Sequence, residues 1–319
     1  MIRRCRLCAE DDVLIPQLTL DGSSAFGEPF TLSRCEECGA WQVDPPLSLD
    51  FIHSYFQAPE RWRISHDPEG RPVDPAERAA ARQGEYTKYA SALINSLEEV
   101  GRVVDIGAGA GVMLSLLPDS FQRIAVEPHP DAAEAASRLG LTVMREWAEN
   151  IDFPSESLTC LIMNQTFDHL RDPSGFLARA VHWLKPGGLL LLTGLINPDG
   201  LMPRLYGPGF RLWHPLYQIY PPPGAMVMVL GSHGFEVLRW WQPYFGTPYG
   251  SLKQLLLNIP EVLCRMMGKG RGQLSPAWPG NTYSLLARKT LLLQPLKDPA
   301  RQGQGRALDP RMLAHPSSG

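Results

Sequence analysis

Short apolar runs alternate with helical patterns through the central part of the chain. Five runs have the length of a β-strand and lie at residues 103–106, 123–126, 141–144, 158–163 and 189–193. The stretches between them have the spacing, or the capping residues, of short helices. Strands that alternate with helices form a parallel sheet with helices on both faces. We therefore predict an α/β fold with a Rossmann-like, doubly wound, mostly parallel sheet.

Further elements are expected on either side of this core. A helical period runs over residues 82–97, and Asp172 followed by Pro173 predicts the N-cap and first residue of another helix. Later patterns predict a helix at 224–231 and strands at 235–240 and 282–287. The chain thus continues as an α/β domain to about residue 290.

Residues 197–223 interrupt the alternation. They contain seven prolines and five aromatic residues, a composition typical of irregular structure. Because aromatic rings suit a flat or sugar-like compound, we expect this insertion to form a lid or a pocket wall. Residues 291–319 are rich in Pro, Gln and Arg without any period, which predicts a flexible tail.

Four of the six cysteines form two C-x-x-C pairs near the N-terminus, Cys5 with Cys8 and Cys35 with Cys38. Each tight turn of this kind can point two thiolates at one ion, so two pairs are typical of a zinc site. Disulfides and redox pairs are the alternatives, and a reducing cytoplasm argues against disulfides. Four cysteine ligands leave no open position for substrate, which predicts structural Zn²⁺.

The predicted zinc ribbon spans residues 1–46 and carries the wrong charge for gripping phosphates. It has four arginines and no lysine against eight carboxylates, a net charge of −4. A role in docking or folding is favoured instead. The expected division of the chain is a zinc ribbon at 1–46, a linker and helical cap at 47–100, the α/β domain at 101–290, and the tail at 291–319.

The overall composition is that of an ordinary globular protein. Of 319 residues, 44% are apolar and 20% charged, and the net charge is −3, which excludes wholesale disorder and a strongly basic nucleic-acid binder. The longest apolar run is too short to span a bilayer, and no signal-peptide-like stretch follows the first residues. We expect a cytoplasmic protein with no membrane partner, and nucleic acid is disfavoured. The oligomeric state is open.

A glycine loop follows the first strand of the α/β pattern. Gly107, Ala108, Gly109 and Gly111 lie between that strand and a helix, where glycine lets the backbone approach a ligand closely. The dinucleotide fingerprint would need its third glycine at position 112, which is valine. The alternative is a turn needed only for strand–helix packing.

Two acidic residues indicate which ligand the loop holds. Asp105 stands just before the loop, where a carboxylate repels pyrophosphate but suits a cationic amino group. Glu127 ends the next strand, 20 residues after Gly107, where an acidic residue can accept hydrogen bonds from both ribose hydroxyls. A ribose with an ammonium group and no phosphate describes S-adenosylmethionine.

These residues resemble those of the class I S-adenosylmethionine-dependent methyltransferases. The match covers residues 103–188, includes the Leu184-Lys185-Pro186-Gly187-Gly188 turn, and continues weakly to about residue 289. The cysteine pairs, the 44–46 Asp-Pro-Pro and the 213–217 Trp-His-Pro-Leu-Tyr segments are similar to the zinc-ribbon-bearing members, which occur in sugar-modification and natural-product pathways. The resemblance implies that the following residues contact the cofactor: Asp105, Gly107, Ala108, Gly109, Gly111, Glu127, Trp147, Ala148 and Asn164.

Trp147 is a departure from the family pattern. The family usually has an Asp-Ala pair where this chain has Trp147-Ala148. Trp147 could stack on adenine, with Glu146 or Glu149 meeting the exocyclic amine, or it could be a core residue. The family's Phe-Asp before the fourth strand is Leu158-Thr159 here.

Methyl transfer to a hydroxyl or an acidic C–H needs a proton acceptor, and histidine is suited to this near neutral pH. His169 follows the fourth strand, in a segment similar to the family's hydrophobic-acidic-His sequence. His214 lies in the aromatic insertion. Either residue could be the base, or both could be structural. The sequence thus predicts a small-molecule methyltransferase acting on a sugar, sugar nucleotide or natural-product scaffold. The alternatives are a non-catalytic cofactor-binding scaffold and an RNA or protein methyltransferase.

Overall fold

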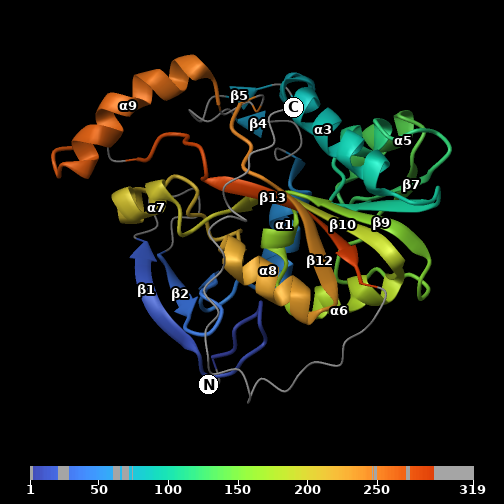
Figure 1. Cartoon of the computed structure of the whole chain (residues 1–319), viewed down its shortest axis with the longest axis horizontal. Coiled ribbons are helices and arrows are strands. Elements are labelled where there is room, and N and C mark those ends of the chain that lie inside the picture. The colour runs from blue at the N-terminus through green and yellow to red at the C-terminus, as the bar shows by residue number, and fades with distance from the viewer. Residues whose placement is uncertain are drawn as a thin grey trace.

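The computed structural model describes residues 3–20, 29–59, 65–66, 72–73, 75–245, 247, 250–270 and 274–290. The tail expected at 291–319 lies outside these residues. A seven-stranded sheet forms the centre, in the order β12-β13-β10-β9-β6-β7-β8 (Figure 1). Its strands are β6 (Arg102–Ile106), β7 (Gln122–Val126), β8 (Thr142–Met144), β9 (Leu158–Asn164), β10 (Leu184–Ile196), β12 (Phe235–Trp241) and β13 (Thr282–Lys289). Only β13 runs antiparallel to its neighbours, so the predicted doubly wound, mostly parallel sheet is confirmed.

The strand residues alternate between two cores on opposite faces of the sheet. Leu161 and Met163 of β9 point into one core, and Cys160 and Ile162 point into the other. This alternation follows from the two-residue period of a strand. Because both faces are covered, β9 reads as a continuous apolar run rather than an alternating one.

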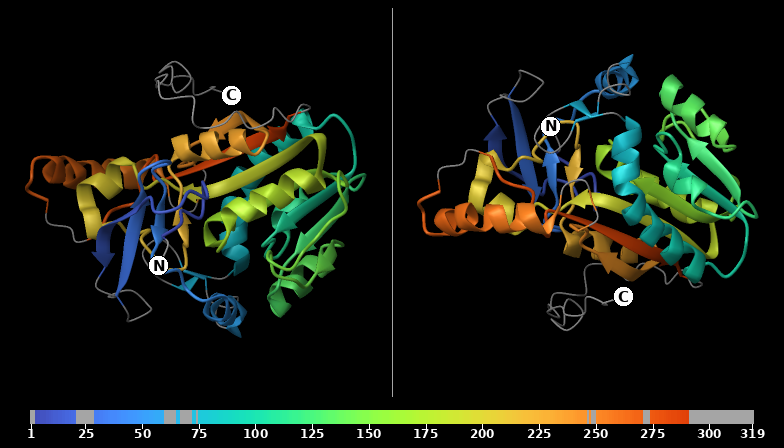
Figure 2. Two further views of the ribbon diagram at one scale, coloured as in Figure 1. Left: turned by 90° about the horizontal axis from the view of Figure 1, so that it is seen from below. Right: turned by 90° about the horizontal axis from the view of Figure 1, so that it is seen from above.

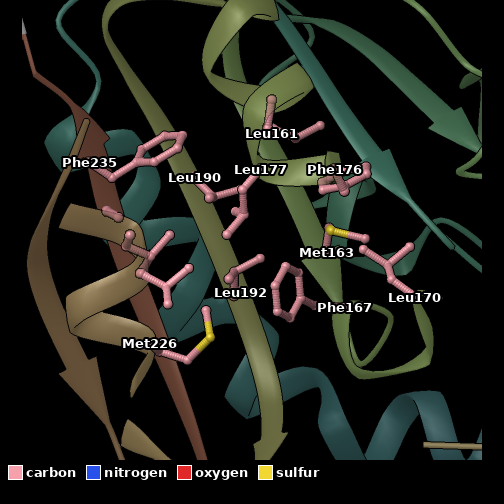
Figure 3. Close-up of a cluster of buried hydrophobic side chains, with 14 of the residues drawn as sticks. Leu161, Met163, Phe167, Leu170, Phe176, Leu177, Leu190, Leu192, Met226 and Phe235 are labelled. Carbon is pink, nitrogen blue, oxygen red and sulfur yellow. The ribbon is translucent and has the colours of Figure 1, made fainter. Parts of the chain in front are cut away.

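The first core packs under α6 (Pro173–Trp183) and α8 (Pro223–Ser232). Figure 3 shows Phe176 and Leu177 of α6 and Met226 of α8 meeting the β-strand side chains there. Helix α6 begins as predicted, with the Asp172 side chain accepting a hydrogen bond from the Gly175 N–H and proline in the first turn. The second core packs under α3 (Pro75–Ser96), α4 (Val112–Ser115) and α5 (Pro130–Arg138).

A second sheet stands at one end of the molecule (Figure 2). Its strands are β1 (Leu14–Leu20), β2 (Phe30–Cys35), β3 (Trp41–Val43) and β11 (Ile219–Tyr220), in that order. The fourth strand comes from the 197–223 insertion and pairs antiparallel with β3. The sequence did not predict this pairing, which joins the N-terminal segment directly to the α/β domain.

The remaining elements surround these two sheets. Helix α1 (Leu49–Gln57) follows the N-terminal sheet, and the short strands β4 (Ser65–His66) and β5 (Pro72–Val73) pair with each other. The insertion forms α7 (Leu201–Tyr206) and the 3₁₀ turn η2 (Gly207–Gly209), while η1 (Phe167–His169) follows β9. Helix α9 (Leu252–Met266) lies at the periphery beside α7. None of the helices in the described ranges combines the length and apolar character needed to cross a bilayer.

Candidate functional site

A cavity of about 300 Å³ lies at the carboxyl ends of β6, β7 and β9. This edge is where open α/β sheets bind their ligands. The glycine loop, the end of β7, the segment after β8, the end of β9 and helix α1 contribute to its wall. The lining residues are Ile52, His53, Phe56, Ile106, Gly107, Gly109, Glu127, Pro128, His129, Ala132, Glu146, Trp147, Ala148, Glu149, Asn164, Gln165, Thr166, His169 and Leu170.

The three glycines of the loop have different structural roles. All three have positive φ, with +72° at Gly107, +55° at Gly109 and +75° at Gly111, a conformation that glycine adopts without strain. Gly107 and Gly109 line the cavity, but Gly111 and Ala108 do not. A β-carbon at Gly111 would lie 2.3 Å from Leu141 Cδ1, so this glycine permits close packing of the loop.

Glu127 is fixed by two backbone N–H groups. Its Oε2 accepts from Gly109 N–H at 2.8 Å, and its Oε1 accepts from His129 N–H at 2.9 Å. Burial raises the pKa of this carboxyl, while the two N–H donors oppose the rise. Each carboxylate oxygen has a second lone pair. The side chain can therefore bind the glycine loop and still accept hydrogen bonds from a ligand.

Asp105 lies beneath the loop and not on the cavity wall. It is fully buried, and neither carboxyl oxygen has a hydrogen-bond partner within the described part of the chain. Burial, and next the charge of Glu127, raise the pKa of Asp105 well above its usual range, and the Asn164 backbone lowers it by less. An unpartnered buried carboxyl is costly, and this cost agrees with the raised pKa of Asp105.

Helix α1 contributes Ile52, His53 and Phe56 to the cavity wall. The ring of His53 stacks on Trp147, with ring centres 3.8 Å apart and an interplanar angle of 12°, and His53 Nε2 lies 3.8 Å from Glu149 Oε2. Trp147 is half-buried at the wall and not in either core. Ile52, His53 and Phe56 are site residues that sequence reasoning missed, and the aromatic residues of segment 47–57 are the only signal that could have indicated them.

Asn164 connects the cavity to one helix and one neighbouring strand. Its amide nitrogen donates to Tyr86 Oη at 3.1 Å, and its Oδ1 accepts from Thr193 Oγ1 at 2.5 Å. The residue therefore lines the cavity with its orientation fixed from α3 and β10.

His169 lies on the cavity wall in a defined tautomer. Its Nδ1 is 2.9 Å from the Leu216 carbonyl oxygen, and since a carbonyl only accepts, Nδ1 carries the proton and Nε2 keeps its lone pair. Tyr217 stacks on the ring at 4.7 Å, and Phe56 meets it edge-on at 5.0 Å. Burial lowers the pKa of His169 to about 4, so the ring is neutral at neutral pH.

His214 has the opposite tautomer to His169. Its Nδ1 accepts from the Leu216 N–H at 3.3 Å, so the neutral ring carries its proton on Nε2. The residue is absent from the cavity lining given above, although its ring lies 5.9 Å from that of Tyr217. The structure therefore brings His169, and not His214, to the cavity.

Comparison with known proteins identifies the family in which this sheet and this glycine loop occur together. A family model described as a methyltransferase domain matches residues 78–239, about half of the chain. The chain belongs to this methyltransferase domain family. The match begins within α3 and ends within β12, and thus includes the glycine loop, Glu127 and His169.

Two curated proteins and one solved structure are similar to this methyltransferase domain protein. The chain is 27% identical over 186 residues to the ubiquinone biosynthesis O-methyltransferase of Rhodopseudomonas palustris (strain BisB18), covering 55% of this chain and 65% of that protein. It is 24% identical over 119 residues to 2-methyl-6-phytyl-1,4-hydroquinone methyltransferase 2, chloroplastic, of Oryza sativa subsp. japonica, covering 35% of this chain and 34% of that protein. The chain thus spans less than two thirds of either relative.

The solved structure is the complex between the Haloferax volcanii Trm112 methyltransferase activator and the putative methyltransferase. The similarity has a TM-score of 0.50 at 15% sequence identity and covers 68% of this chain and 95% of that chain. At this level of identity it shows the fold alone, which agrees with the strand order of the central sheet.

The four N-terminal cysteines meet at a single point. Their Sγ atoms all lie within 4.8 Å of one another, with 3.6 Å between Cys5 and Cys38 and 3.7 Å between Cys8 and Cys35. These separations exceed a disulfide bond of about 2.05 Å. Four sulfurs at about 2.3 Å from a tetrahedral zinc ion would lie about 3.8 Å apart. The donor set and its spacing therefore fit Zn²⁺.

The two C-x-x-C turns have the same backbone construction. In the first, the Cys5 N–H donates to the Glu10 carbonyl and the Ala9 N–H donates to the Cys5 carbonyl, both at 2.9 Å. In the second, Cys35 and Gly39 make the equivalent bonds, at 2.8 and 3.0 Å. Ala9 and Gly39 both have positive φ. This repeated turn aims both thiols of each pair to the same side.

Proposed function

We propose that this protein transfers a methyl group from S-adenosylmethionine to a small-molecule acceptor in the cavity at the carboxyl edge of the sheet. The observation that carries the proposal is the Glu127 carboxylate, held by the Gly109 and His129 N–H groups beside the glycine loop. Carboxylate oxygens placed this way suit the two hydroxyls of a ribose.

The other cofactor contacts follow from the cavity wall. Gly107 and Gly109 leave room for close backbone approach, and Trp147 and Ala148 line the same cavity, so we assign them to the adenine ring. Asp105 does not line the cavity, so its part in cofactor binding is proposed from the family resemblance alone. The side chain of Asn164 supports the same wall.

Bound S-adenosylmethionine would supply an electrophilic methyl carbon and a neutral thioether leaving group. His169 Nε2 would accept the proton that an acceptor hydroxyl loses as its oxygen bonds to that carbon. The Leu216 carbonyl holds His169 in the required tautomer, and Phe56 and Tyr217 fix the plane of its ring. Proton acceptance of this kind contributes about 10²–10⁴-fold to a rate.

The acceptor is proposed by class. Sugars, sugar nucleotides and natural-product scaffolds agree with the zinc-ribbon resemblance. The names of the two curated relatives refer to ubiquinone biosynthesis and to a phytyl hydroquinone, so we add aromatic hydroxyl compounds. The rings of Phe56 and Tyr217 beside His169 would suit a flat acceptor of this kind.

We propose that the four-cysteine cluster holds structural Zn²⁺ through Cys5, Cys8, Cys35 and Cys38. Hydrogen bonds from the Cys38 and Cys8 thiols lower the pKa of Cys5, in keeping with a thiolate ligand. With four sulfur ligands, the ion would have no open position for an acceptor.

Calorimetry with S-adenosylmethionine tests the cofactor assignment. We expect the wild-type protein to bind it, and Glu127→Gln to bind about 10–100-fold more weakly because hydrogen bonds to a charged acceptor are lost. The matched control is Glu134→Gln, an exposed position on α5, which should leave affinity unchanged. A folded wild-type protein that binds no S-adenosylmethionine would refute the proposal.

Turnover with a panel of catechols, hydroquinones and sugar nucleotides, measured as S-adenosylhomocysteine release, tests the base. His169→Gln should lower kcat with little effect on S-adenosylmethionine affinity, and His214→Gln should retain most activity. The reverse result would assign the base to His214. Cofactor binding without turnover on any acceptor would instead favour the scaffold alternative.

A further inference from the structure

Helix α9 leaves several large apolar side chains exposed to solvent, while polar side chains take up part of the face that it turns to the protein. One face of the helix carries Leu252, Leu256 and Leu263, and Met267 continues it just after the helix ends. The large apolar residues exposed on and just after α9 have exposed fractions of 52–67%. A surface helix normally buries its apolar stripe. Here only Val262 of the helix is buried.

The opposite face of α9 is polar and turned inward. Four half-buried polar residues recur there at intervals of four, three and four residues: Gln254, Asn258, Glu261 and Arg265. The Arg265 guanidinium fastens this face to α7, with Nε donating to the Leu205 carbonyl at 3.1 Å and the group lying 4.6 Å above the Tyr206 ring. Figures 1 and 2 show α9 beside α7, at the edge of the molecule. Specific contacts therefore fix the orientation of the helix, and within the part of the chain that the structure describes its apolar face is exposed.

The charges around the apolar face are positive. Within residues 251–270 the exposed charged side chains are Lys253 and Lys269, in a protein whose overall net charge is −3. Lys253 at the start of the helix and Lys269 just beyond its end are both exposed. Glu261, the one acidic residue, belongs to the inward face. An apolar strip with basic residues at its ends is the composition of a helix that lies flat on an anionic membrane surface.

A second copy of the chain fits this face less well. In a two-fold symmetric contact each surface meets itself, so two α9 helices packed antiparallel about Glu261 would place Lys253 of one opposite Lys269 of the other. Like charges would then meet at both ends of the contact. An anionic lipid surface has no such conflict.

We propose that α9 docks this protein on the surface of a bilayer that contains anionic lipids, with Leu256 and Leu263 inserted among the acyl chains and Lys253 and Lys269 at the headgroups. The sequence had led us to expect no membrane partner. The apolar face of α9 changes that expectation to peripheral binding.

Sedimentation with two kinds of vesicle tests the proposal. One kind is phosphatidylcholine alone, and the other contains about one third phosphatidylglycerol, which supplies negative surface charge. We expect the full-length protein to bind the anionic vesicles, and rising salt to weaken the binding. Leu256→Ser with Leu263→Ser should weaken it about tenfold or more, because each leucine loses its apolar burial. Lys253→Ala with Lys269→Ala should weaken it by about tenfold or more on anionic vesicles only.

The matched control is Val227→Ser with Met228→Ser, since both residues are exposed and apolar but lie on α8. This variant should bind vesicles as the wild-type protein does. No binding to anionic vesicles, or equal binding by the leucine variant, would overturn the proposal. So would a dimer, seen by light scattering, that the leucine variant dissociates. Vesicle binding needs neither cofactor nor turnover, so its failure would leave the proposed methyl transfer untouched.

Discussion

Arg6 of the N-terminal segment holds the main chain of Gln218, 212 residues further along the sequence. Its Nη2 donates to the Gln218 carbonyl at 2.6 Å and to the Val43 carbonyl at 2.8 Å. Two residues before Gln218, the Leu216 carbonyl accepts the hydrogen bond from His169 Nδ1. One guanidinium group therefore connects the first cysteine turn, β3 and the segment that orients His169.

Replacing Arg6 should affect stability and the site together. Arg6→Met keeps much of the side-chain volume but removes the Arg6 donor from the Val43 and Gln218 carbonyls, of which the second keeps the Val43 N–H. We expect a cost of about 2–4 kcal/mol in the free energy of unfolding. Urea unfolding measures this change. Arg4→Met is the control, because Arg4 is exposed and surface substitutions cost about 0.5 kcal/mol or less. Equal stability of the two variants would show that the connection carries little energy.

The cysteine cluster predicts a metal-dependent fold for the N-terminal sheet. Cys35→Ser removes one of four ligands, so the bound zinc measured by elemental analysis should fall from about one equivalent to well below one. Chelation of zinc should melt β1–β3 before the α/β domain, since metal binding is part of the folding free energy. Cys264→Ser is the control, because Cys264 lies on α9, far from the cluster in sequence. Unchanged zinc content in Cys35→Ser would contradict the assignment.

Local signals in the sequence predicted the α/β core well. The apolar runs identified the central strands because most of these strands, β9 above all, are buried on both faces. The Asp172-Pro173 pair identified the start of α6. The C-x-x-C spacing identified four cysteines that do meet in space. In each case the residues that carry the signal are close together in the sequence.

Contacts between distant segments were not predictable in the same way. Strand β11 is two residues long and exists because it pairs with β3, and His53 reaches the cavity only because α1 packs across Trp147. Helix α9 gave no expectation, since Pro260 interrupts its pattern and its apolar face is not in the core. Tertiary packing decides such elements, and propensity alone does not.

Two glycines of the loop should respond differently to substitution. Gly109→Val should abolish S-adenosylmethionine binding, because a branched side chain would occupy cavity space and φ at this residue is +55°. Gly111→Ala should mainly lower stability, by about 1–3 kcal/mol, since its β-carbon would collide with Leu141. Calorimetry and thermal melting separate the two effects. Unchanged affinity in Gly109→Val would show that the ligand lies elsewhere.

Asp168 should make the protein less stable as the pH rises. The carboxyl is fully buried without a hydrogen-bond partner among the described residues, and burial raises its pKa to about 7. Between about pH 4 and pH 7 the folded state keeps a proton that the unfolded state has lost, so the free energy of unfolding falls as the pH increases through this window. Relative to the wild type, Asp168→Asn should therefore gain up to about 2–4 kcal/mol between pH 5 and pH 8. An exposed control, Asp119→Asn, should show no such trend.

His169 should give the opposite slope at lower pH. Its pKa is lowered by burial to about 4 from an ordinary value of 6.5, so below about pH 6.5 the unfolded state takes up a proton that the folded state does not. The free energy of unfolding then falls as the pH decreases from about 6.5 to 4. His169→Gln removes this contribution, so its stability relative to the wild type should rise over the same range, by up to about 3 kcal/mol. The measurement is urea unfolding at several pH values, with His233→Gln as the control. If the stability difference between His169→Gln and the wild type stays constant with pH, the His169 ring is open to water and able to titrate in the folded protein.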